Sequence, residues 1–491
     1  MEILSSAVVG ELVTRSLNFI ISKISKPTLM DVEDRLPRVL LRAQVIIDEA
    51  MGRHITNQAM LLQLSMVRDA MYRGYYMLDT FSYQSHHEGR KDKAVTRSSS
   101  SSEVNSRKRL SSFSRNTLVL EQMQEALDDL SSLILDVQEL VVFLASYPRM
   151  SRQPYSMHLQ LANCMFGRQM EAQFVINFLL SPQPHGTKEL DVLPVVGPCH
   201  VGKSTLVAHV CKDERVRDHF SGILFFRIHG FTDDELATFK KGCAAKHQNL
   251  SDSDGRLLVV IELIWDLNED AWNRLYSTST QCAPSGSKII VTSRYDKIVK
   301  FGTTKALTLK YLPHEAHWYF FKTLIFGSMD PKMHPRLAHL AMEIAKVVNT
   351  PLAANSTARF LRDNFDTRFW CKILTFLRGN FQKHVSRFGD PFELLNQNRP
   401  AHLGRVATPF EDIVIECQYQ RFSEEEVPEI SILDVMYGSV KPQGKFEALA
   451  WRSEIPPYYS YVFACEIQEI KTTATKRKHS VLVENKSGTF G

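Results

Sequence analysis

The sequence predicts a multidomain protein with an N-terminal four-helix bundle, a central α/β unit on a parallel sheet, a following helical region and a small β-rich C-terminal region. Through residues 1–146, apolar residues recur at steps of three and four, which is the period of an amphipathic helix. From residue 163 onward, short apolar runs alternate with helical stretches, as in a parallel sheet covered by helices. Because 491 residues are too many for a single core, separate domains are expected.

The N-terminal region contains four segments that each have one apolar face. These segments are residues 9–24, 36–47, 60–81 and 123–144. Pro37 lies near the start of the second segment, where a helix tolerates proline. The fourth segment alternates steps of four and three, which is typical of helices that pack on helices. An intramolecular bundle is favoured over an extended coiled coil, because no segment sustains the pattern beyond about four heptads.

Three polar stretches separate or follow these regions. Residues 82–116 are rich in serine and basic side chains and are predicted to be a disordered loop, because they cannot bury enough apolar surface to offset the cost of ordering. Phosphoregulation or contact with an acidic surface is the alternative to a plain solvated insert. Residues 147–165 are interpreted as a linker, and the tail from Lys471 is expected to be frayed. Its basic cluster 476–479 is either solvated or a nuclear signal.

Composition excludes several classes of function. A net charge of +5 is small for this length, so we expect no specific nucleic-acid partner. The eight cysteines form no C-x-x-C pair and no metal-ligand spacing, which indicates reduced thiols in a reducing compartment. The N-terminus lacks the features of a secretory signal, and no run of about 18 apolar residues predicts a membrane span. A cytoplasmic protein is therefore expected.

The central region begins with a phosphate-binding pattern. Residues 197–205 match G-x-x-x-x-G-K-[ST], between an apolar run at 192–196 that predicts a strand and a helical start at 206–210. A coincidental Gly/Ser turn is the alternative, but the strand and helix are the setting that such a loop requires. The predicted strands of this region are residues 193–196, 223–227, 257–261 and 288–292. In the C-terminal region, strands are expected over residues 430–437, 446–451 and 458–470.

The residue types of the loop assign its chemistry. Backbone N–H groups around Gly197 and Gly202 would surround phosphates at the positive end of the helix. The ammonium of Lys203 would reach the outer phosphates, and the Ser204 hydroxyl would hold Mg²⁺. The expected nucleotide-binding residues of the loop are Gly197, Val201, Gly202, Lys203, Ser204 and Thr205.

Three further positions have two interpretations each. Glu262 ends an apolar strand 59 residues after Lys203, where a P-loop domain holds its metal with a carboxylate, but a solvated strand end would look the same. Arg294 ends the strand at 288–292 and is either a γ-phosphate partner or a surface arginine. Pro351 either packs on a base or belongs to a plain turn.

Taken in order, these motifs resemble the NB-ARC domain of plant intracellular immune receptors of the coiled-coil class. Residues 166–171 resemble the G-R-x-x-E segment that helps hold adenine in that family, which implies a nucleotide-binding role for Arg168. Residues 258–265 resemble L-L-V-L-D-D-V-W, and residues 286–294 resemble G-S-K-I-I-V-T-T-R. Residues 349–353 resemble G-L-P-L-A, whose proline lies by the base.

The resemblance extends to the N-terminal region, because residues 67–81 are similar to the third helix of the family's four-helix domain. It implies a switch that binds ADP or ATP with Mg²⁺ and acts in the defense response through its helical N-terminus. The implied partners are other immune-receptor chains or signalling proteins, with possible self-association. The implied domains are a helical domain at 1–146, the linker at 147–165, the P-loop domain at 166–305, a helical ARC-type subdomain at 306–395 and the β-rich region at 396–491.

Several residues depart from the family pattern. Glu262 replaces the first aspartate of the strand motif, and Leu263 replaces the second, presumed water-orienting acid, so at most a weak ATPase is expected. Pro198, Cys199 and His200 stand in place of flexible glycines. No Met-His-Asp element follows residue 395, and no leucine-rich repeat is visible. The alternative function is a scaffold, decoy or regulatory protein with a degenerate nucleotide site.

Overall fold

The structure is a computed structural model. It describes residues 29–95, 102–149, 165–182, 189–228, 232–248, 255–264, 266–397, 399–408, 410–421, 425–455 and 458–469. The first expected helix at 9–24, most of the expected linker and the polar tail lie outside the described residues. No helix in the described part of the chain has the length and apolar character that a membrane crossing needs.

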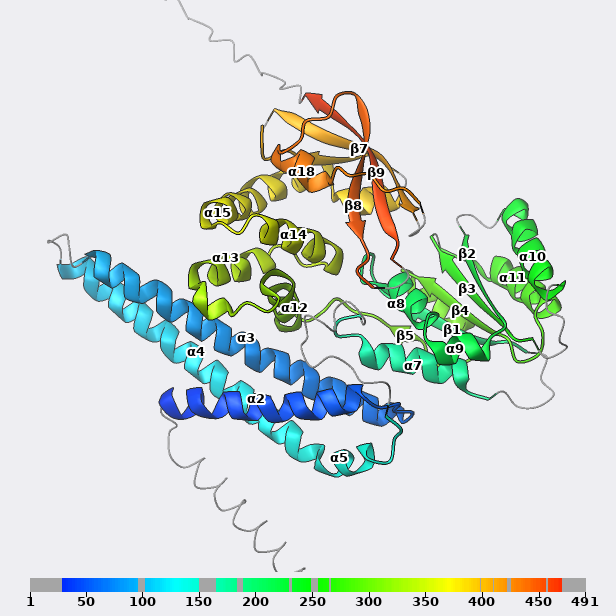
Figure 1. Ribbon diagram of the computed structural model, residues 1–491, viewed down its shortest axis with the longest axis horizontal. Helices are drawn as coiled ribbons and strands as arrows, with labels where there is room; N and C mark the ends of the chain where they lie inside the picture. The colour runs from blue at the N-terminus through cyan, green and yellow to red at the C-terminus, as the bar shows by residue number, and fades with distance from the viewer. Residues whose placement is uncertain are drawn as a thin grey trace, which may run out of the picture.

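The N-terminal region is helical, with α2 (Leu29–Met51), α3 (Gln58–Val95), α4 (Ser102–Asp136) and α5 (Gln138–Leu144). Figure 1 shows α3 and α4 as a long pair of helices with α2 packed along them. Leu36, Leu64 and Met123 are fully buried, one from each of these three helices. The second, third and fourth expected segments are therefore helices that pack through the apolar faces that the sequence predicts.

The prediction of a disordered loop over residues 82–116 is wrong at both ends. Helix α3 continues to Val95 and α4 begins at Ser102, while residues 96–101 lie outside the described part. A helix satisfies its own backbone hydrogen bonds, and this stretch contains lysine, arginine and glutamate, which favour helices, so no apolar face is needed to extend the two helices. Pro37 was also misplaced, because α2 begins at Leu29 and the proline lies inside the helix.

The central region is an α/β unit on a five-stranded parallel sheet in the order β2-β3-β4-β1-β5. Its strands are β1 (Asp191–Val196), β2 (Gly222–Ile228), β3 (Leu257–Leu263), β4 (Lys288–Ser293) and β5 (Leu307–Thr308). The first four confirm the predicted strands, and β5 was not predicted. Leu193 and Val195 pack on one face of the sheet and Val192 and Val196 on the other, because successive side chains of a strand alternate.

Helices cover both faces of this sheet (Figure 1). They are α7 (Gln169–Leu180), α8 (Lys203–Val210), α9 (Glu214–His219), α10 (Asp233–Gln248) and α11 (Glu269–Cys282). Ser293 is the last residue of β4, and a short 3-10 helix, Asp296–Phe301, follows before β5. This arrangement is the α/β fold of P-loop nucleotide-binding proteins, with the phosphate loop between α8 and β1, which lies inside the sheet between β4 and β5.

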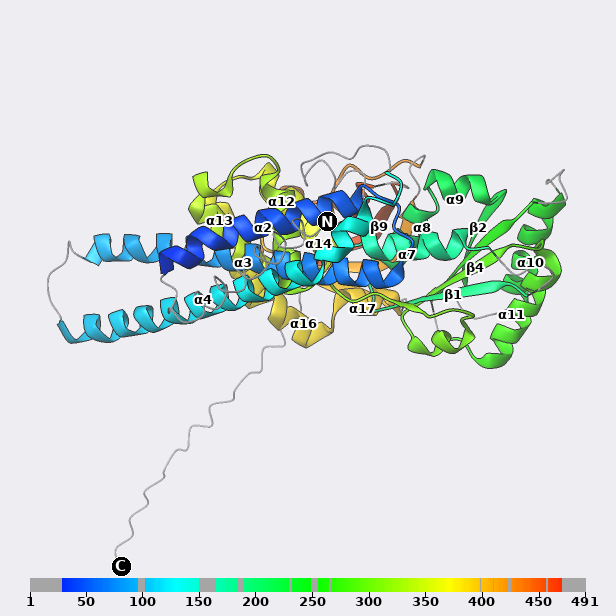
Figure 2. The same ribbon diagram turned by 90° about the horizontal axis from the view of Figure 1, so that it is seen from below.

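A helical region follows, with α12 (His314–Phe326), α13 (Pro335–Ala345), α14 (Pro351–Asp363), α15 (Thr367–Phe376), α16 (Gln382–Phe388) and α17 (Pro391–Asn396). Helix α12 packs against α3 and α14, so this region lies between the N-terminal helices and the C-terminal sheet (Figures 1 and 2). The fully buried Trp318 and Trp370 anchor its core.

The C-terminal region contains an antiparallel sheet in the order β6-β7-β9-β8, and the start of its strand β9 lies nearest α8, while its arrowhead lies at the far end in Figure 1. Its strands are β6 (Ala401–Gly404), β7 (Glu411–Arg421), β8 (Lys445–Arg452) and β9 (Ser460–Glu469). The expected strands at 446–451 and 458–470 are confirmed, while β6 and β7 were missed. The strand expected at 430–437 is wrong, because this stretch is the helix α18 (Ile432–Tyr437). Ser431 and Asp434 form a capping box that starts a helix there.

Candidate nucleotide-binding site

The phosphate loop requires glycine at both ends. Gly197 has φ 153° and Gly202 has φ 96°, and Gly202 is the N-cap residue of α8. A Cβ atom on Gly197 would lie 2.3 Å from the Leu309 carbonyl oxygen, and one on Gly202 would lie 2.3 Å from Met165 Cε. The loop therefore turns sharply from β1 into α8, and it brings backbone N–H groups to the N-terminus of that helix.

The residues that replace the family's flexible glycines still form a tight turn. His200 has φ 56°, so it adopts the left-handed conformation that a glycine would take without strain. Burial, together with the nearby charge of Lys203, lowers the pKa of His200 to about 4. The imidazole is therefore neutral at neutral pH and adds no positive charge to the loop.

The ammonium of Lys203 is held by the loop itself. Its Nζ donates to the carbonyl oxygens of Gly197 at 2.7 Å and Pro198 at 2.8 Å. Burial lowers the pKa of Lys203. Arg294, at the end of β4, donates to Cys199 Sγ at 3.7 Å, so a second cation lies against the same loop. Both cations are placed to neutralise a polyanion at the amides of the loop.

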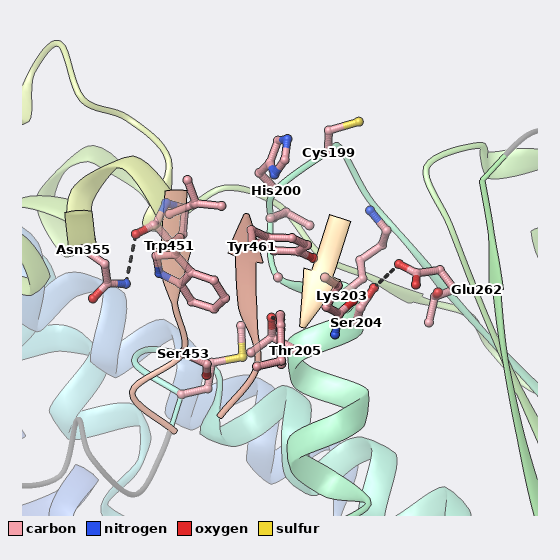
Figure 3. Close-up of a pocket in the computed structure, with 18 of the residues that line it drawn as sticks. Cys199, His200, Lys203, Ser204, Thr205, Glu262, Asn355, Trp451, Ser453 and Tyr461 are labelled. Atoms are coloured by element: carbon pink, nitrogen blue, oxygen red, sulfur yellow. Dashed lines mark hydrogen bonds between the residues drawn. The ribbon is translucent and has the colours of Figure 1, made fainter. Parts of the chain in front are cut away.

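The expected metal ligands, Ser204 and Glu262, lie next to each other (Figure 3). The Ser204 hydroxyl donates to Glu262 Oε1 at 2.5 Å. Oxygen donors of this kind are those that Mg²⁺ prefers, together with phosphate oxygens and water, so these two side chains taken by themselves have the chemistry of magnesium ligands. The other carboxylate oxygen, Glu262 Oε2, accepts from Nε of Arg227 at 3.1 Å and from Nη2 at 3.0 Å. Within the described residues, no cluster of three His, Cys, Asp or Glu side chains could hold a metal by itself.

Sequence reasoning missed Arg227. It lies opposite Glu262 in the register of β2 and β3, and its Nη2 also donates to Gln420 Oε1 of β7 at 3.0 Å. The apolar pattern predicted a strand at 223–227, but it did not show that this strand pairs with β3 or that Arg227 lies opposite Glu262. The signal that could have suggested this pair is a basic residue, Arg227, and an acidic residue, Glu262, near the ends of two predicted strands.

Arg168 and Pro351 come from other elements than the phosphate loop. Arg168 is buried, donates to Glu171 Oε1 at 3.0 Å and also donates to the Lys310 carbonyl oxygen. Pro351 is the first residue of α14, which the Thr350 side chain caps. A cavity of about 310 Å³ brings these residues and the loop together. Its lining includes the expected site residues Arg168, Val201, Gly202, Lys203, Ser204, Thr205, Glu262, Arg294 and Pro351. Gly197 shapes the loop behind them.

Comparisons with known proteins give distant matches. No family model matches the chain. It is 25% identical over 228 residues to the disease resistance protein RGA2 of Solanum bulbocastanum, which covers 42% of this chain and 23% of that protein. It is 23% identical over 404 residues to the putative disease resistance RPP13-like protein 1 of Arabidopsis thaliana, which covers 76% of this chain and 37% of that protein.

The matches thus span less than a quarter of RGA2 and just over a third of the second relative. All five matched curated proteins are disease-resistance proteins. The chain is therefore similar to plant disease-resistance proteins over part of their length. Among solved structures, C. elegans PCH-2 aligns over 40% of this chain and 64% of that chain at 12% identity, with a TM-score of 0.29, which is too weak to bear on the fold.

Leu263 lines the cavity next to Glu262 and is itself buried. Its side chain packs into the core on one face of the sheet. A leucine neither accepts a proton nor orients water, so no acid stands at the position that follows the carboxylate.

The C-terminal sheet forms a further wall of the cavity. Trp451, Tyr459 and Tyr461 line it, and Figure 3 shows Trp451 and Tyr461 on strands that face the loop. The Tyr459 hydroxyl is hydrogen-bonded to the Thr205 hydroxyl of α8. Burial raises the pKa of Tyr459 to about 12, so both hydroxyls are neutral. The alternating aromatics predicted a strand, but nothing local to them indicates that they face a loop 254 residues away.

Proposed function

We propose that this chain is an ADP/ATP-binding molecular switch of the plant immune-receptor type, acting in the defense response through its helical N-terminal region. The observation that carries the proposal is the phosphate loop at the N-terminus of α8, with Lys203 and Arg294 against it and a cavity in front of it. Helix N-termini bind phosphate through unpaired N–H groups and the helix dipole.

The cavity suggests how a nucleotide would lie. Its lining includes Lys203, Ser204 and Arg294, where the phosphates would bind. It also includes Phe166, Leu312 and Pro351, apolar side chains of the kind on which a base packs. The base would then contact the segment that joins the nucleotide-binding unit to the helical region.

Phe166 and Gly167, which precede α7, contact the N-terminal helix α3, which gives a route for a signal. Arg68 of α3 donates from Nη1 to the Gly167 carbonyl oxygen at 2.9 Å. The ring centroids of Tyr72 and Phe166 are 5.3 Å apart, and those of Phe166 and Phe320 are 5.0 Å apart. A change at the base would thus reach α3 through directly packed side chains. This supports signalling through the helical region, with other receptor chains, signalling proteins or a second copy as partners.

The first test identifies any nucleotide that co-purifies with the chain by mass spectrometry. Calorimetry then measures ADP binding by the wild type, by Lys203→Ala and by the control Lys212→Ala, an exposed lysine just after α8. Removing Lys203 takes away a buried cation at the phosphates, so we expect affinity to fall by about 100-fold, consistent with two charge-assisted bonds of about 1.5 kcal/mol each. No binding by the wild type would refute the proposal.

A scaffold, decoy or regulatory protein with a degenerate nucleotide site is the second candidate. The buried Leu263 beside Glu262 favours it, because this position lacks the acid that would orient water. Under this alternative, the full chain with Lys203→Ala would capture the same partners as the wild type, although it binds no nucleotide. Loss of those partners in Lys203→Ala, but not in Lys212→Ala, would favour the switch.

A further inference from the structure

We infer that Arg227 acts as a built-in counter-cation for Glu262, so that this site takes a nucleoside diphosphate without Mg²⁺ and disfavours a Mg²⁺–triphosphate. The inference rests on the proposed function, since it concerns which nucleotide the same site selects. It also assigns a role to Gln420 of the C-terminal sheet, which would hold Arg227 in place.

Both oxygens of the Glu262 carboxylate already have partners. Oε1 accepts from the Ser204 hydroxyl at 2.5 Å, and Oε2 accepts from Nε and Nη2 of Arg227 at 3.1 and 3.0 Å. The side chain of Arg227 is 40% exposed and that of Glu262 is 29% exposed, so solvent weakens the attraction between them but does not separate them. A guanidinium that donates two N–H groups to one carboxylate is fixed in orientation by the two hydrogen bonds, in addition to the attraction between the charges.

A magnesium ion at Glu262 would have to displace these contacts. The Ser204 hydroxyl would turn its lone pair to the metal and give up its bond to Oε1. Arg227 and the metal would then share one carboxylate, and two cations near one anion repel each other. A diphosphate without metal needs the loop amides and Lys203 and leaves the contact between Glu262 and Arg227 intact.

Gln420 limits the freedom of Arg227 to move away. Its Oε1 accepts from Nη2 of Arg227 at 3.0 Å, so the guanidinium bridges β3 and β7. The sheet that carries Gln420 is joined to α8 a second time through the hydrogen bond between Tyr459 and Thr205. Gln420 is therefore a positioning residue. Although it is distant in sequence, it holds Arg227 next to Glu262 and so disfavours a metal ion at that carboxylate.

The test measures the affinity of the full chain for ADP and ATP by calorimetry, each with excess EDTA and with excess Mg²⁺. For the wild type we expect ADP affinities that agree within about three-fold in the two conditions, and weaker binding of Mg²⁺–ATP. In Arg227→Met, which keeps the apolar stem, Mg²⁺–ATP binding strengthens by about three- to ten-fold because the carboxylate is released. Gln420→Ala changes it in the same direction by a smaller factor.

Arg274→Met is the matched control, because Arg274 pairs with Asp233 on the surface and lies outside the cavity lining. It should bind as the wild type does. Glu262→Gln provides a second, independent test: adding Arg227→Met to Glu262→Gln should not strengthen Mg²⁺–ATP binding further, because the arginine acts through the carboxylate that Glu262→Gln has removed. A wild type that binds ADP only with Mg²⁺, or an Arg227→Met variant with unchanged Mg²⁺–ATP affinity, overturns this inference and leaves the proposed function standing. A wild type that binds no nucleotide in either condition overturns both.

Discussion

The buried contact between Asp79 and α12 lets the coupling of the N-terminal helices to the rest of the chain be measured. Asp79 Oδ2 accepts from Trp318 Nε1 at 2.8 Å and from Lys322 Nζ at 2.5 Å. The Asp79 and Lys322 side chains are 17% and 16% exposed, and Trp318 is fully buried. In Asp79→Ala, both donors lose their acceptor, and water can reach the lysine better than the indole.

The magnitude follows from these two donors. A hydrogen bond to a charged group contributes about 1.5–3 kcal/mol, and an unpaired buried donor costs about 1–3 kcal/mol. Because Lys322 can partly turn to solvent, we expect Asp79→Ala to lower the free energy of unfolding by about 3 kcal/mol, within the range for breaking a buried ion pair. Asp79→Asn keeps an acceptor for Trp318 and should cost about half as much.

The assay is denaturant unfolding followed by circular dichroism, with hydrogen exchange of α3 and α12 to locate the loss. Asp129→Ala is the matched control, because the pair between Asp129 and Arg73 is 49% exposed on both sides. An exposed pair of this kind contributes about 0.5 kcal/mol. If Asp79→Ala destabilises the chain no more than Asp129→Ala, or if exchange rises equally in all helices, the contact does not join the two regions.

Two further outcomes are expected. Leu263→Asp should raise the rate of phosphate release from ATP, because a positioned acid typically contributes about 10²–10⁴-fold, and a wild type faster than the variant would contradict this reasoning. Burial lowers the pKa of His317 from 6.5 to about 4, so the folded protein holds it neutral. Stability from this residue is therefore complete above pH 6.5 and is lost as the pH falls toward 4, and His317→Gln should flatten the acid side of a plot of unfolding free energy against pH. Equal acid sensitivity of the two proteins would show that other groups dominate.

Local patterns predicted the parts of the fold that depend on neighbours in sequence. The period of apolar residues gave α2, α3 and α4, and the apolar runs gave β1 to β4. The same patterns failed where a helix needs no apolar face, as in residues 84–95, and where a cap outweighs strand-like composition, as at Ser431. Strand β7 was missed although its first half is buried.

The amino-acid sequence by itself determined the phosphate loop, because the two glycines, the lysine and the hydroxyl of residues 197–205 act through a backbone turn only nine residues long. Only the tertiary structure decided what faces that loop. Arg227 and Gln420 are 193 residues apart, and Thr205 and Tyr459 are 254 residues apart, yet each pair is hydrogen-bonded. Such contacts depend on how sheets and helices pack, and packing between distant segments leaves no periodic signal along the chain.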